Sequence, residues 1–164
     1  MKFSSIKEYF YKLYNICYLL TLIPLGVFIY LYMNMQAGKI NILVQERNTI
    51  LMLQIVVFAF ATFFLTIVHL VIKKKMKVLS SKMGLGNKMD QYYYLSLIRI
   101  GSGAFVSSAI GLGLLYTGSE IFSVFFLGIL LWMAFQWPTP KKMCVELKLK
   151  GDEKEMILYK RESL

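Results

Sequence analysis

Four long apolar runs constrain this chain more than any other feature of its sequence. They cover about 15–33, 49–72, 93–116 and 120–137. A helix needs about 20 mostly apolar residues to cross the hydrocarbon core of a bilayer, and each run is close to that length. The runs are apolar around their whole circumference, which argues against a soluble helical bundle with polar outer faces. The sequence therefore predicts an all-α integral membrane protein with four transmembrane helices.

The basic residues lie mostly on one side of these predicted spans. The chain carries 19 Lys and Arg against 9 Asp and Glu. Only Lys39 and Arg47 fall in the two segments on the other side, and Arg99 lies inside a run. Because basic segments stay in the cytoplasm, both termini are predicted to be cytoplasmic (N-in and C-in). The abundance of Lys, Ile, Tyr, Phe and Asn is typical of an AT-rich bacterial genome, which favours the cell (inner) membrane.

The basic balance of the chain also predicts its first partner. The net charge is +10 and 57% of the residues are hydrophobic. In a soluble protein such a charge suggests nucleic acid, but here the lysines lie between spans, so no nucleic acid is expected. The predicted partner is the bilayer itself, with anionic lipids on its cytoplasmic face.

The segment before the first run has its own pattern. Apolar residues recur at helical spacing from Phe3 to Leu13, and Ser5 and Glu8 have the spacing of a capping box. This predicts a short amphipathic N-terminal helix on the inner membrane surface that continues into the first span. The alternative is a frayed terminus anchored by its lysines.

The chain divides into a predicted transmembrane domain, 1–140, and a cytoplasmic tail, 141–164. Apolar and charged residues alternate from Val145 to Lys150, and Gly-Asp at 151–152 marks a turn. This pattern predicts a β-hairpin over 143–160, the alternative being a flexible tail. Because a lone hairpin is marginal in water, it is expected to lean on another surface, such as a second copy or another protein.

Small residues form one face of the third predicted span. Gly103, Ser107 and Gly111 lie four residues apart, and Ala104 and Ser108 widen the face. Such spacing lets another helix approach closely. The pattern predicts helix packing here, against a neighbouring span, a second copy or a different subunit.

Basic residues near the inner ends of two spans form the candidate binding site. Helical rise places Arg99 about 9 Å into the third run and His69 about 6 Å into the second. Arg99 has no Asp or Glu beside it within any apolar run, so it is expected either to reach lipid phosphate or to line a cationic pocket. The pocket would hold lipid head groups or other anions between the two helices. Its predicted members are Arg99, His69, Lys73, Lys74 and Lys75.

The sequence offers no catalytic set. Its one His and two Cys lie in different regions, so neither a metal site nor a cofactor is expected. Ser107 lies about 15 Å deeper than His69 by helical rise, too far for proton transfer. The expected function is therefore a non-catalytic accessory or assembly subunit, or a binding partner, within a larger membrane complex. The alternative is an oligomeric small-solute transporter or channel, or an anionic-lipid-binding membrane protein.

Overall fold

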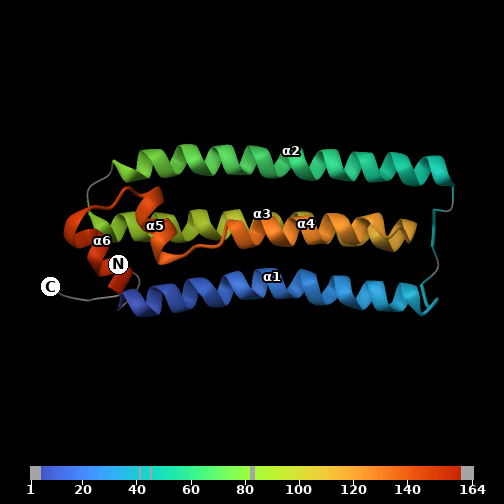
Figure 1. Ribbon diagram of the computed structural model, residues 1–164, viewed down its shortest axis with the longest axis horizontal. Coiled ribbons are helices and arrows are strands. Elements are labelled where there is room, and N and C mark those ends of the chain that lie inside the picture. The colour runs from blue at the N-terminus through green and yellow to red at the C-terminus, as the bar shows by residue number, and fades with distance from the viewer. Residues whose placement is uncertain (1–4, 41, 45, 82–83, 160–164) are drawn as a thin grey trace.

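The computed structural model describes residues 5–40, 42–44, 46–81 and 84–159, and within these ranges it is helical with no strand. Three helices, α1, α2 and α3, are each long and apolar enough to cross a membrane. A fourth crossing is formed if α4 and α5, which are bent by 74° at their junction, act as one broken span. The predicted helical bundle is confirmed to the extent that three to four helices are long and apolar enough to cross a membrane. The helices are α1 (Ile6–Gln36), α2 (Arg47–Ser80), α3 (Leu85–Thr117), α4 (Ile121–Phe135), α5 (Pro140–Glu146) and α6 (Gly151–Tyr159) (Figure 1).

The three long helices extend well beyond the apolar runs. They contain 31, 34 and 33 residues, which at a rise of 1.5 Å gives about 45–50 Å, against a hydrocarbon core of about 30 Å. The extra turns lie where α2 ends and α3 begins, an end of the bundle that we call the lysine-rich end. Lys73, Lys74 and Lys75 belong to helix α2 here rather than to a loop as the sequence suggested.

The first turns of α1 show why the N-terminal segment is helical. The Ser5 side chain accepts a hydrogen bond of 3.1 Å from the Glu8 amide, so the predicted N-cap is confirmed. From Ile6 the helix runs without interruption into the first span, so the amphipathic segment is not a separate helix. Phe3, the first residue of its predicted apolar stripe, lies outside the described residues.

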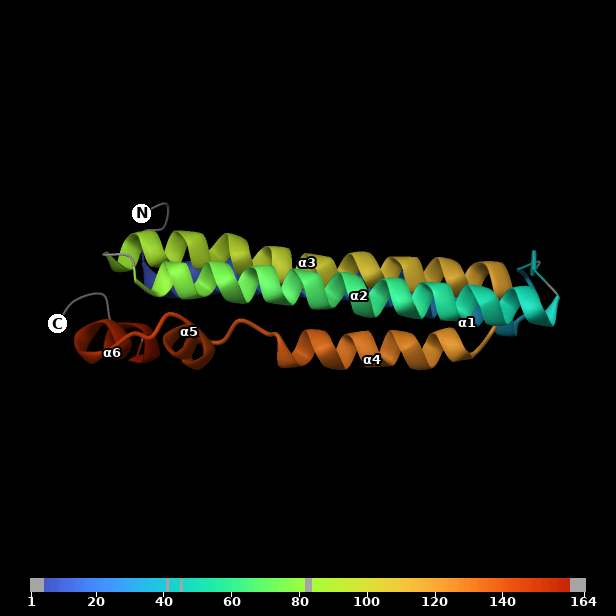
Figure 2. The ribbon, with the colours of Figure 1, turned by 90° about the horizontal axis from the view of Figure 1, so that it is seen from above.

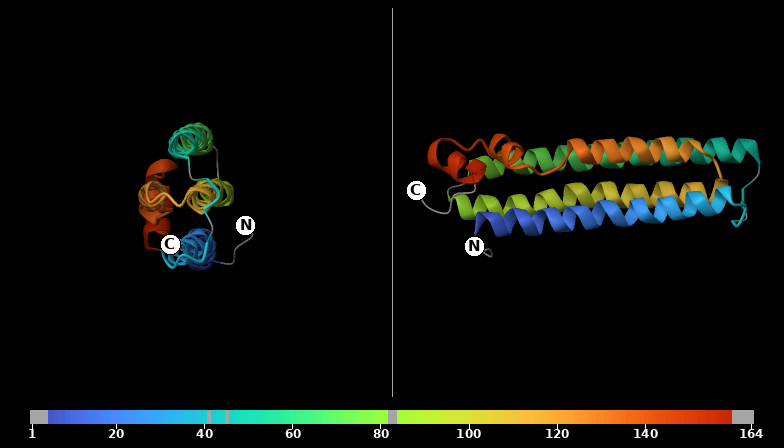
Figure 3. Two further views of the ribbon diagram at one scale, coloured as in Figure 1. Left: turned by 90° about the vertical axis from the view of Figure 1, so that its right-hand side faces the viewer. Right: turned by 60° about the horizontal axis from the view of Figure 1, so that its bottom comes forward.

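Helix α3 is the centre of the bundle. It packs against α1, α2 and α4, and the end-on view shows α3 between α1 and α2 with α4 against its side (Figure 3). In its most apolar stretch 61% of the residues are buried, against 11% in α1 and 17% in α2. The outer helices therefore present most of their apolar surface outward, as expected for helices that face lipid.

The small-residue face of α3 is used inside this bundle. A Cβ atom added at Gly103 would lie 2.6 Å from Cγ of Met133 on α4. At Gly111 the nearest atoms belong to α1, with Phe28 at 3.8 Å. The predicted helix packing is thus intramolecular, at two neighbouring helices. Ser107 and Ala104 are buried with these glycines, whereas Ser108 is exposed and donates a hydrogen bond to the Ala104 carbonyl.

The predicted β-hairpin is wrong, because the tail folds as two short helices. The Thr139 side chain caps α5, which begins at Pro140, a residue suited to the first helical turn. Lys148 (φ 51°) and Gly151 (φ 53°) then adopt left-handed conformations that turn the chain between the helices. The apolar alternation therefore reflects a helix end followed by a turn, in which Leu147 and Leu149 both reach the core.

Helices α5 and α6 cover the lysine-rich end on the same side as α4 (Figure 2). Met143, Leu147 and Ile157 are fully buried there against apolar residues of α1, α2 and α3. Helix α1 begins and α6 ends at this same end of the bundle (Figure 1). The tail is thus covered by its own bundle and does not depend on a second chain to bury these side chains.

Candidate functional site at the lysine-rich end

Arg99 has an acidic partner that the sequence did not suggest. The side chain is only 3% exposed, and its Nη1 donates to Oε1 of Glu146 on α5 at 2.9 Å. Glu146 lies outside every apolar run, in the segment expected to be a strand. A buried arginine without a counter-charge is strongly unfavourable, so the ion pair links the docking of α5 to the centre of the bundle.

Further polar side chains surround this ion pair. The Tyr92 side chain is hydrogen-bonded to Ser96 and to Glu146, and Arg99 Nε is buried beside them. Tyr92, Ser96 and Arg99 follow one another at spacings of four and three, which places them on one face of α3. Native proteins pair nearly all of their buried polar groups, and these side chains form a polar network around the ion pair inside the bundle.

A cavity of about 600 Å³ opens beside the ion pair, between α2, α3 and the α5–α6 turn. Its volume falls within the range of small-molecule sites in proteins, about 300–1,000 Å³. Helix α2 supplies one wall of the cavity, α3 contributes Arg99, and the segment around α5 contributes the rest. The lining residues are His69, Leu70, Lys73, Lys74, Met76, Lys77, Arg99, Glu146 and Lys148.

The cavity brings together most of the predicted basic residues. His69, Lys73, Lys74 and Arg99 all line it, although they come from two helices. Lys75 does not line the cavity, and its side chain is exposed elsewhere on α2. This difference follows from helical geometry, since residues 73, 74 and 75 point about 100° apart around the axis.

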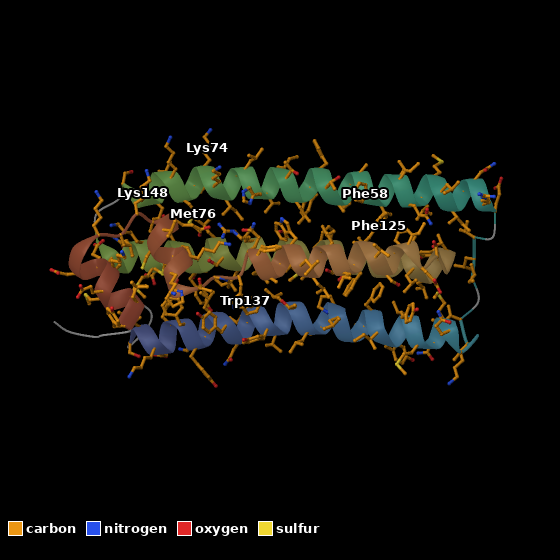
Figure 4. All side chains as sticks on the ribbon, in the orientation of Figure 1. Phe58, Lys74, Met76, Phe125, Trp137 and Lys148 are labelled. Carbon is orange, nitrogen blue, oxygen red and sulfur yellow. The ribbon has the colours of Figure 1, made fainter. Side chains whose placement is uncertain are left out.

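Three charged lining residues were missed by the sequence analysis. Lys77 follows Lys73 by one helical turn, so its spacing could have revealed it. Glu146 and Lys148 come after α4 in the sequence, and they line the cavity only because α5 packs against the bundle. The resulting wall carries five cationic side chains and one carboxylate, which makes it strongly positive. In Figure 4, Met76 and Lys148 are labelled near α5, and Lys74 is labelled on the upper edge of α2.

A second ion pair holds the tail beside the cavity. Lys88 of α3 lies 3.1 Å from Glu153 of α6, and the lysine side chain is only 11% exposed. Each tail helix is therefore tied to α3 by one ion pair, at Glu146 and at Glu153. These carboxylates position the cavity wall that carries Lys148.

The described residues contain no cluster of three His, Cys, Asp or Glu side chains that could hold a metal ion. Cys17 and Cys144 are both buried as free thiols. The site offers positive charge and hydrogen-bond donors, from lysine ammonium groups and the Arg99 guanidinium, together with the apolar side chains of Leu70 and Met76.

Comparisons of the chain with protein families, with characterised proteins and with solved structures find no match.

Proposed function

We propose that this chain is a non-catalytic membrane protein that binds an anionic lipid at its lysine-rich end, with the phosphate held in the cavity beside Arg99. The observation that carries the proposal is the convergence of four lysine side chains and the buried Arg99 on one cavity. Phosphate oxygens accept hydrogen bonds from arginine and lysine with favourable geometry and charge. Basic pockets between membrane helices near the cytoplasmic surface are suited to lipid head groups.

The orientation of the chain supports this assignment. The lysines of α2 and the tail lie at one end of the bundle, and the positive-inside rule places that end in the cytoplasm. Anionic lipids give the cytoplasmic surface its negative potential, so lysine-rich helix ends there are attracted to it. In this orientation the cavity lies at the level of the head groups rather than of the acyl chains.

Two sequence features that suggested a protein partner have internal roles in the structure. The small-residue face of α3 packs on α1 and α4, and the tail packs on its own bundle. The accessory-subunit function is therefore a prediction with less support than lipid binding. A transporter or channel function also stays a prediction, without a specific feature of the structure that favours it.

Lipid retention by the purified protein tests the proposal. The protein is extracted in mild detergent, exchanged into nanodiscs that contain phosphatidylglycerol and phosphatidylethanolamine, and re-extracted, and the retained lipid is measured by native mass spectrometry. We expect retained phosphatidylglycerol in the wild type, and a loss of about tenfold in Arg99→Gln, equivalent to one charged hydrogen bond.

A matched pair of surface variants keeps the proposal testable if Arg99→Gln does not fold. Lys74→Gln removes a lysine that lines the cavity, whereas Lys75→Gln removes its neighbour, which does not. Both change the net charge equally, and both side chains are exposed on α2. We expect reduced retention only for Lys74→Gln. Equal retention in both variants, or no enrichment of phosphatidylglycerol in the wild type, would contradict the proposal.

A further inference from the structure

A second, apolar groove lies deeper along the same side of α2. It has a volume of about 280 Å³ and is formed by α2 and α4 over the side of α3. Its only lining residue with a polar side chain is Thr62, whose hydroxyl donates to the backbone carbonyls of its own helix. The groove therefore presents an apolar surface. The lining residues are Val57, Phe58, Ala61, Thr62, Leu65, Ile110, Val124, Phe125, Gly128 and Ile129.

The groove and the cationic cavity are adjacent on α2. Ala61 and Leu65 line the groove, and His69 lines the cavity. These three residues are spaced by four, so they follow one another on a single face of the helix. Figure 4 shows the labelled residues of the groove, Phe58 and Phe125, further along the seam between α2 and the layer of α4 and α5.

The depths of the two sites match on both helices. Near the far end of the groove, Phe58 precedes His69 by eleven positions on α2, and Ile110 follows Arg99 by eleven positions on α3. At 1.5 Å per residue either interval is about 16 Å. This is close to half of the hydrocarbon thickness of about 30 Å, the depth that the acyl chains of one leaflet occupy.

A glycine keeps the groove open. Gly128 of α4 is exposed, and a Cβ atom added there would meet nothing within 4 Å. At Gly103 and Gly113 of α3, by contrast, an added Cβ would clash with side chains of α4. The absence of a side chain at 128 thus does not serve packing within the chain and leaves space against α2.

From this arrangement along α2 we infer that one anionic phospholipid occupies both sites, with its phosphate in the cationic cavity and one acyl chain in the groove between α2 and α4. The inference rests on the proposed function, because the cavity must first bind the head group. It adds that the ligand is an intact lipid and not a soluble phosphate. Acyl chains fill any apolar groove that faces the bilayer, so the distinctive claim is that the head group selects which lipid enters.

Photo-crosslinking tests this claim. Two probes carry the same diazirine-terminated acyl chain, one on phosphatidylglycerol and one on phosphatidylethanolamine. After illumination in nanodiscs, labelled peptides are quantified by mass spectrometry. We expect phosphatidylglycerol to label peptides covering 57–65 and 124–129 roughly fivefold more than phosphatidylethanolamine, reflecting the charge-assisted contacts of its phosphate. Equal labelling by the two probes would overturn the inference.

Substitutions at either the cavity or the groove test whether one lipid occupies both. Lys74→Gln is expected to reduce labelling of the groove by phosphatidylglycerol, although the substitution lies more than three helical turns from residues 57–61, whereas Lys75→Gln is expected to leave it unchanged. Gly128→Leu fills the groove and is expected to reduce phosphatidylglycerol retention by roughly threefold, the scale of packing contacts between apolar groups in membranes. Its control is Gly26→Leu, at an exposed glycine of α1 where an added Cβ also meets nothing.

The possible failures are distinguishable. If the wild type retains no phosphatidylglycerol, the proposed function itself is wrong. If retention depends on Lys74 but is the same in Gly128→Leu as in Gly26→Leu, the head-group site stands and the acyl-chain site is overturned. The remaining experiment measures competition between glycerol phosphate, added at millimolar concentration, and the bound lipid. If this soluble phosphate competes for the site as tightly as the intact lipid, the acyl chain contributes nothing to binding, and the inference is overturned.

Discussion

The two ends of the bundle bury their side chains in different ways. At the lysine-rich end all six helices contribute to one apolar core. Along the spans the buried core is smaller, and four helices share it. Helix α1 shows the change within a single element: its buried residues are frequent from Ile6 to Cys17, after which only Phe28 is buried.

The difference reflects the solvent that each region faces. In water an exposed apolar side chain is unfavourable, so the segments beyond the membrane need α5 and α6 to cover them. In lipid the outer faces of α1 and α2 gain little from further burial, because acyl chains are as apolar as leucine. Burial in α1 thus falls off after Cys17, close to the predicted start of the first span.

The largest effect is expected in the core of the lysine-rich end. Leu147→Ala should lower the free energy of unfolding by about 2–4 kcal/mol, because Leu147 is fully buried and leaves a cavity. Val145→Ala, two residues away and 76% exposed, should change it by less than about 0.5 kcal/mol. Thermal unfolding in detergent, followed by circular dichroism, measures both. Similar values for the two variants would show that the tail does not pack as described.

The ion pair between the tail and α3 should give the next largest effect. Glu146→Gln keeps the shape of the side chain but removes the counter-charge of buried Arg99, so stability should fall by about 2 kcal/mol. The same change removes the only negative charge from the cavity wall, so phosphatidylglycerol retention should rise. Unfolding and lipid retention are measured on one preparation. A fall in both stability and retention would contradict the electrostatic account of the cavity.

Helix packing within the spans should respond less strongly. Gly113→Ala places a Cβ against the Phe122 ring of α4 and should destabilise by about 1–2 kcal/mol. Gly101→Ala, also on α3 but with nothing within 4 Å, should be neutral or stabilising by up to about 1 kcal/mol. The difference between their unfolding midpoints is the informative quantity. Equal midpoints would mean that α3 and α4 are not in close contact.

The smallest effect is expected on the lipid-facing surface. Ile23 of α1 is 62% exposed, so Ile23→Ala should change the unfolding free energy in detergent by less than about 0.5 kcal/mol. The comparable substitution Ile100→Ala on α3, where the side chain is fully buried, should destabilise by about 2–4 kcal/mol. A large effect at Ile23 would instead reveal a protein that covers this face and would revive the accessory-subunit prediction.

Local properties of the sequence were enough to locate the membrane-spanning helices. Long apolar runs require helices because backbone groups in lipid must be hydrogen-bonded within their own segment. The Ser5 cap was also readable, since it depends on neighbouring residues. The sequence also paired His69 and Arg99 by depth, because helical rise converts residue number into distance along a helix, and it added Lys73 and Lys74 from the adjoining segment.

The tertiary structure alone decided what surrounds these residues. Arg99 and Glu146 are 47 residues apart in the chain, and no local pattern relates them. The prediction of a β-hairpin in the tail was wrong because alternation of apolar and charged residues over six positions is also produced by a helix end followed by a left-handed turn. The choice between them depended on a core assembled from six helices, where Leu147 and Ile157 are buried. Sequence thus determined what each segment is, through local hydrogen bonding and hydropathy, while long-range packing determined which charges meet and where a cavity remains.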